Sequence, residues 1–110
     1  MTVAPPGIVR MVRDRILAGD VTFSPHFWEH AEVEDFGYIQ AREVVLAGIV
    51  IDWMPDRQRL LFCARIRNDY RRLVWLHVVV DYTNPLSTGI VTAYVPDPSQ
   101  WEEPPLRRRR

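Results

Sequence analysis

Two periodicities divide this chain near residue 48. Before that point apolar residues recur every three or four positions, and after it they largely alternate with polar residues. The first spacing is typical of amphipathic helices, and the second of strands buried on one face. The order of the two halves therefore predicts an α+β domain in which the helices come first.

Three helices are predicted in the first half. Residues 7–18 carry one apolar stripe and are followed by Gly19, a natural C-terminal stop. Ser24 before Pro25 is an N-cap and first-turn signal, which predicts a short helix over residues 25–34. A third helix is expected over residues 38–46, between Gly37 and Gly48.

Four strands are predicted after Gly48, over residues 49–54, 59–67, 74–82 and 89–95. Their connections are short, and a parallel crossover needs about a dozen residues or more, so neighbouring strands should be antiparallel. The predicted fold is α+β, with two to three N-terminal helices packed on one four-stranded antiparallel sheet. Residues 1–110 are expected to form a single domain, globular over about 7–101, with residues 102–110 as a disordered or partner-dependent basic tail.

The alternation gives the strands two unlike faces. The apolar face is the predicted core beneath the helices, and its members are Leu60, Phe62, Ala64, Ile66, Val74, Leu76, Val78 and Val80. The opposite face carries charged, imidazole and aromatic groups, namely Arg59, Arg65, Arg67, Trp75, His77 and Asp81. The helices leave this second face free, so the tail, a partner or a substrate must cover it.

Composition narrows the class of protein. A chain of 110 residues that is 47% hydrophobic and 25% charged is typical of one soluble globular domain. No apolar run approaches the roughly 20 residues of a membrane-spanning helix, and the first residues show no signal-peptide pattern. A cytoplasmic protein without membrane contact is therefore expected. The single cysteine, Cys63, lies in an apolar strand, where an inert thiol is expected.

The net charge of zero conceals an uneven distribution. All 14 basic residues are arginines, and they gather in residues 57–72 and at the end of the chain, whereas acidic residues gather in residues 29–35. Arginine makes planar, bidentate contacts to phosphate or carboxylate, so the arginine-rich side suits RNA or an acidic protein partner. The alternative is that these arginines are only solubilising charges.

The second sheet face also holds the groups that metal-independent RNA cleavage requires. Such cleavage needs an acid and a base, for which histidine is suited, and a cation near the phosphate, for which arginine is suited. The candidate catalytic residues are His77, His26, His30, Tyr94 and Asp81. The candidate substrate-binding residues are Arg65, Arg67, Arg59 and Trp75, the last as a stacking platform for a base. The alternative for His77 is a structural, hydrogen-bonded residue.

Other site types have little support. His26 and His30 have helical spacing, but they form no HExxH motif, and a single cysteine gives no CxxC pair, so neither a metal nor any other cofactor is predicted. The chain also has no glycine-rich phosphate loop and no Gly-x-Ser-x-Gly elbow. These absences disfavour nucleotide-binding enzymes and serine hydrolases.

Four motifs resemble the bacterial domain-of-unknown-function family 4258: FSPH (23–26), GIVIDW (48–53), LHVVV (76–80) and TAYVPDPSQW (92–101). The resemblance spans roughly residues 10–110. It implies a small bacterial protein, often encoded beside a zinc-finger antitoxin-like protein, which would be its partner. More distantly it implies a RelE/MqsR-like toxin fold, whose members cleave mRNA.

The match to this family is incomplete. His30 and Glu34 stand where the family typically has arginines. If those arginines bind phosphate in relatives, this chain has lost or changed that contact. The segment around Pro96, Pro98 and Trp101 is expected to be a chain-reversing turn with an aromatic anchor packed back on the sheet. The leading hypothesis is a toxin-like, metal-independent endoribonuclease of a toxin-antitoxin-type system. The alternative is a non-catalytic module that binds protein or nucleic acid through the arginine-rich face.

Overall fold

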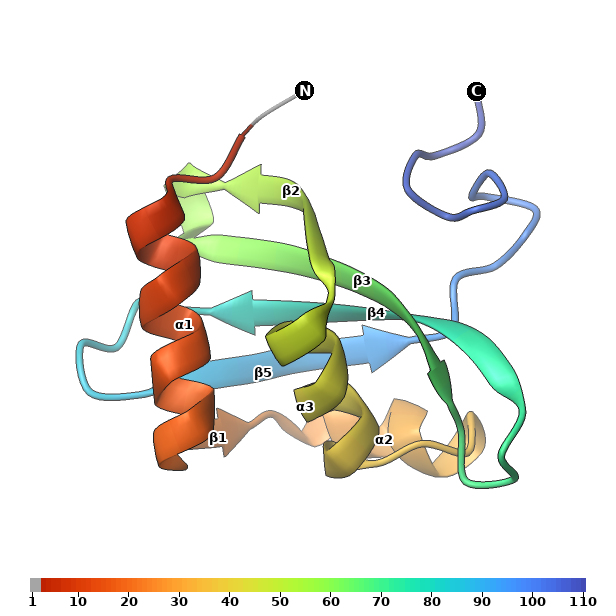
Figure 1. Cartoon of the computed structure of the whole chain (residues 1–110), viewed down its shortest axis with the longest axis horizontal. Helices are drawn as coiled ribbons and strands as arrows, with labels where there is room; N and C mark the ends of the chain where they lie inside the picture. The colour runs from red at the N-terminus through yellow and green to blue at the C-terminus, as the bar shows by residue number, and fades with distance from the viewer. Residues whose placement is uncertain (1–2) are drawn as a thin grey trace.

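The structure, a computed structural model that describes residues 3–110, contains three helices and one sheet of five strands (Figure 1). The helices are α1 (Pro6–Ala18), α2 (Pro25–Val33) and α3 (Tyr38–Ala47). The strands are β1 (Val21–Phe23), β2 (Ile49–Met54), β3 (Arg59–Arg67), β4 (Leu73–Asp81) and β5 (Thr88–Tyr94). The predicted α+β class is confirmed. No helix within residues 3–110 is long and apolar enough to cross a membrane.

The sheet corrects the prediction of four antiparallel strands. Its order is β1-β5-β4-β3-β2, and β1 pairs in parallel with β5, with Val21 opposite Thr88 and Phe23 opposite Ile90. The remaining pairs are antiparallel. The sheet is therefore five-stranded and mixed. The chain enters β1 directly after α1, through Gly19 in the left-handed conformation (φ 80°), which glycine adopts without steric cost.

The predicted capping signals fix the helix ends. The Ser24 hydroxyl accepts a hydrogen bond from the Phe27 N–H at 3.3 Å and donates one to the carbonyl of Val91 on β5. The Gly37 N–H donates to the Gln40 side chain at 2.8 Å, which is one half of a capping box. The start of α2 is thus tied to the sheet.

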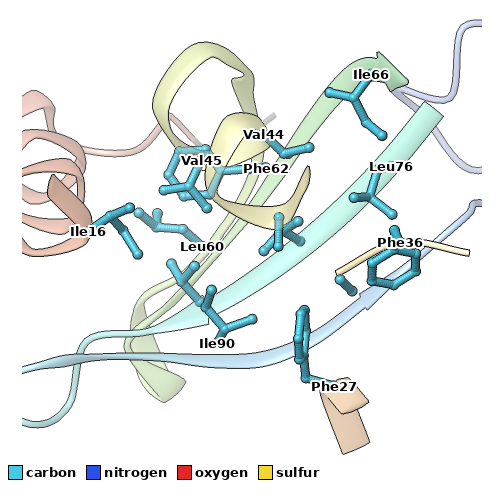
Figure 2. Close-up of a cluster of buried hydrophobic side chains, with 14 of the residues drawn as sticks. Ile16, Phe27, Phe36, Val44, Val45, Leu60, Phe62, Ile66, Leu76 and Ile90 are labelled. Atoms are coloured by element: carbon cyan, nitrogen blue, oxygen red, sulfur yellow. The ribbon is translucent and has the colours of Figure 1, made fainter. Parts of the chain in front are cut away.

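All three helices contribute to a core on one face of the sheet (Figure 2). Six of the eight residues predicted for this core are buried, and Ala64 and Val74 are partly buried against it. The helical side chains labelled in Figure 2 are Ile16, Phe27, Val44 and Val45, the strand side chains are Leu60, Phe62, Ile66, Leu76 and Ile90, and Phe36 comes from the loop between α2 and α3. Full burial of one such side chain contributes roughly 1.5–3 kcal/mol. This layer therefore fixes which side chains occupy the opposite face.

Candidate functional site

The chain after β5 turns back across the sheet face that the helices leave free. Trp101 is only 6% exposed, and its ring lies edge-on to that of His77, with 4.4 Å between the ring centroids. The predicted aromatic anchor is therefore confirmed. The Trp75 indole donates to the Glu103 carboxylate at 2.9 Å, which adds a second attachment. We call residues 97–110 the C-terminal strap.

Hydrogen bonds within the strap give it a defined shape. Trp101 and Arg108 form an isolated antiparallel bridge, and the Glu102 N–H donates to the Arg107 carbonyl at 2.9 Å. The Arg109 guanidinium donates to the Pro98 carbonyl at 2.6 Å. Residues 107–109 are therefore bonded to residues 98–102, with Pro105 buried and the side chains of Arg107 to Arg110 exposed.

His77 lies beneath this strap and is fully buried. Its Nε2 is 2.8 Å from the Pro105 carbonyl oxygen, and its Nδ1 is 3.3 Å from the Tyr94 hydroxyl. Because a carbonyl only accepts, Nε2 carries the proton of the neutral ring, and Tyr94 donates to Nδ1. Burial lowers the pKa of His77 to about 4, so the imidazole is uncharged at neutral pH.

This environment corrects the expectation that His77 stands on a free face. A buried, neutral imidazole has no direct access to a substrate, and its two hydrogen bonds join the strap to β5. The structural alternative for His77 fits these contacts better than the catalytic one. Burial also raises the pKa of the Cys63 thiol to about 11 and that of Tyr94 above its usual value. Both groups are therefore protonated at neutral pH.

The two other histidines lie elsewhere. His26 and His30 belong to α2, which packs on the helix-covered side of the sheet through Phe27 and Ala31. Their nearest charged partners are Glu29, 3.5 Å from His26, and Glu34, 3.1 Å from His30. His26 and His30 therefore lie on the other side of the sheet from His77, and neither forms the predicted acid–base pair with it. Within residues 3–110 no three His, Cys, Asp or Glu side chains gather into a metal-binding group.

The predicted substrate-binding residues separate into two groups along β3. Arg65 lies over the Trp75 ring at 5.9 Å, and Arg67 donates to the Arg71 carbonyl, both near the turn between β3 and β4. Arg59 is at the other end of the strand. The structure therefore does not unite all of the predicted residues in one site.

Arg59 forms a salt bridge of 3.0 Å with Asp81. Burial disfavours the charged carboxylate, but hydrogen bonds from Thr83 and Arg59 outweigh it and hold the pKa of Asp81 below its usual range. Asp81 is therefore an ionised partner of Arg59 at neutral pH rather than a proton donor.

A cleft of about 270 Å³ lies between this end of β3 and the strap. Three arginines line it: Arg57 from the turn after β2, Arg59 from β3, and Arg108 from the strap. Within residues 3–110 neither Arg57 nor Arg108 has an acidic side chain at salt-bridge distance. We call this hollow the arginine cleft.

Hydroxyl groups complete the arginine cleft. Tyr94 lines it, and so does Thr92, whose buried Oγ1 has no hydrogen-bond partner within the described chain. Arg108 lies 4.9 Å from the Trp101 ring, a cation–π contact that positions its guanidinium. Asp52 is the one acidic residue that lines the cleft. The site is thus predominantly cationic, with hydroxyl groups on one wall.

A second hollow of about 360 Å³ continues the arginine cleft along the strap. The two hollows share Asp52, Leu61, Trp101 and Arg108, and the second adds Arg107 and Arg110. Five arginines therefore follow one continuous groove. The sequence analysis missed Arg57, Arg108 and Thr92 as site residues, and the only available signal was the enrichment of arginine in residues 57–72 and at the end of the chain.

No protein-family model, curated protein or solved structure matches this chain. The resemblance to family 4258 therefore stays a prediction.

Proposed function

We propose that this protein binds RNA through the arginine cleft and the groove that continues it. The observation that carries the proposal is the convergence of Arg57, Arg59 and Arg108 on one hollow, two of them without an acidic partner. A guanidinium presents a planar fork of donors that matches two phosphate oxygens.

The shape of the groove favours a single strand over a duplex. The strap contributes one side of the cleft, and the hollow that continues it adds Arg107 and Arg110 to the cationic lining. A flexible single strand can follow such a path, with successive phosphates beside successive arginines. This is the nucleic-acid-binding alternative of the sequence analysis, moved from Arg65 and Arg67 to the other end of β3.

Cleavage of the bound RNA is the second candidate function, as a toxin-like endoribonuclease of the RelE/MqsR-like kind. The contact that favours it is the hydrogen bond between Tyr94, which lines the cleft, and His77 beneath it. In such a reaction the 2′-hydroxyl oxygen attacks phosphorus, its proton passes to Tyr94 while the Tyr94 proton moves to Nδ1, and the relay returns a proton to the departing 5′-oxygen. The low pKa of His77, about 4, makes it a weak base, so binding ranks ahead of cleavage.

Fluorescence anisotropy with a labelled single-stranded RNA of about ten nucleotides tests the binding proposal. Arg57→Glu and Arg108→Glu should each weaken binding by about tenfold or more, the equivalent of about 1.4 kcal/mol. Arg10→Glu is the matched control, since it makes the same charge change on the exposed face of α1. Engagement of about three phosphates predicts a slope near −2 for log affinity against log salt concentration.

Equal weakening by all three variants would show that the RNA responds only to overall charge, and the cleft assignment would be abandoned. Cleavage is tested separately, by incubating the same RNA with the protein in a metal chelator. Products ending in a 2′,3′-cyclic phosphate that disappear in Tyr94→Phe would support the endoribonuclease. Binding without products would leave a binding module.

A further inference from the structure

β2 forms one edge of the sheet, with β3 on one side and no strand on the other within the described chain. An edge strand carries backbone N–H and C=O groups that can pair with an added strand. The first half of β2, Ile49–Val50–Ile51, has no charged side chain, and Ile49 is 53% exposed. Charged residues, the usual protection against strand addition, are therefore missing from this part of the edge.

A large hollow lies directly beside this part of β2. It has a volume of about 800 Å³ and is lined by Ile49, Val50 and Ile51 from the strand, and by Leu106 and Arg107 from the strap. Four of these five residues are apolar. An added strand would therefore find both backbone partners and space for apolar side chains at the same edge.

Charge changes along the strand. Toward Asp52 the neighbouring hollow is lined by Arg107, Arg108 and Arg110, with Asp52 as its one carboxylate. The groove beside β2 is thus apolar near Ile49 and cationic near Asp52. Its complement is an extended segment that is apolar at one end and acidic at the other.

A second copy of this chain fits the edge poorly. A twofold-symmetric pairing of two β2 edges is antiparallel, so the cationic end of each edge would meet the apolar end of the other, and Arg107 and Arg110 would gain no acidic partner. A β-bulge between Val50 and Asp52 also interrupts the regular ladder with β3. Bulges twist an edge strand and restrict long pairing, which favours a short partner segment.

We propose that β2 and its adjoining hollow bind a short, extended segment of an acidic partner protein, which adds to the sheet as a sixth strand. The backbone of the segment pairs with the free edge of β2, its apolar side chains fill the hollow beside Ile49 and Leu106, and its carboxylates meet Arg107 and Arg110. This surface shares Arg107 and Arg110 with the proposed RNA groove, but its backbone edge and apolar lining do not involve Arg57 or Tyr94.

The test uses the full chain labelled with ¹⁵N and a peptide of about ten residues, with alternating Glu and Thr in one half and alternating Val and Thr in the other. Binding should shift the amide signals of residues 49–54 and slow their hydrogen exchange. A peptide with Lys in place of Glu should bind at least about tenfold more weakly, and Arg107→Glu and Arg110→Glu should weaken the Glu peptide by about as much. Arg10→Glu, at an exposed position of α1 that lines neither hollow, should leave its affinity within about twofold.

Three results would overturn the proposal: no exchange protection in β2 up to about 1 mM peptide, equal binding of the Lys peptide, or protection confined to other strands. Sedimentation supplies a fourth. A dimer whose β2 amides are already protected without peptide would assign the edge to a second copy instead.

Discussion

Acidification should destabilise this protein through His77. The pKa of this residue is lowered from 6.5 to about 4 in the folded protein, chiefly by burial. The unfolded chain, with an ordinary histidine, therefore binds more protons between these two values, and the free energy of unfolding falls as the pH falls through that window. The full difference in proton affinity corresponds to about 3 kcal/mol. Such a loss is a large part of a typical domain stability of about 5–15 kcal/mol.

Urea unfolding followed by tryptophan fluorescence measures this loss. From about pH 7.5 to about pH 5, the free energy of unfolding should fall by about 2 kcal/mol through His77 alone. His77→Gln is the matched control, because glutamine can donate to the Pro105 carbonyl but does not titrate. It retains His26 and His30, so the difference between the two pH profiles belongs to His77.

The glutamine variant should be less stable than the original at about pH 7.5, by about 1 kcal/mol, because a flexible amide replaces the rigid ring that bonds both Pro105 and Tyr94. Over the same pH range, the free energy of unfolding of the variant should fall by about 2 kcal/mol less than that of the original. Parallel profiles for the two proteins would refute the assignment of a buried, neutral His77 beneath the strap.

Three further substitutions test other parts of the structure. Gly48→Ala should destabilise the fold by about 1–3 kcal/mol in the same urea assay, since its Cβ would lie 2.4 Å from a backbone oxygen; Gly7→Ala, where the space is empty, is its control and should cause no loss. Ser24→Ala should cost about 1 kcal/mol, because it removes both the cap of α2 and the bond to β5; an unchanged urea midpoint would contradict that role. Trp101→Ala should raise the pKa of His77 from about 4 toward 6.5, measured from imidazole signals by NMR, and a value that stays near 4 would show that Trp101 does not exclude water.

The helices and four of the strands were predictable because each carries its own signal. Gly19, Ser24 and Gly37 mark helix ends within a few residues of the helices they cap. The strands from β2 onward are long enough to show alternation, and β3 has the predicted bounds. β1 is different, since it is three residues long and its parallel partner is β5, late in the sequence. No local pattern encodes such a pairing.

The candidate site was less predictable because the strap builds much of it. The four consecutive arginines at the end are exposed as expected, but Trp101 and Pro105, which precede them in the strap, are buried. The bond between His77 and the Pro105 carbonyl joins positions 28 residues apart. Arg108 likewise reaches the cleft only through the reversal of the strap. The sequence shows which cationic and imidazole groups the chain has, but their grouping depends on these long-range contacts.

The strap also has a consequence for how the protein is made. Cys63 and His77 are both buried and both contact the Pro105 carbonyl, so a newly made chain that has formed β5 but has not yet folded the strap leaves these two side chains open to water. A tag joined to Arg110 would begin beside Asp52, inside the groove, and would change the surface whose binding is being measured.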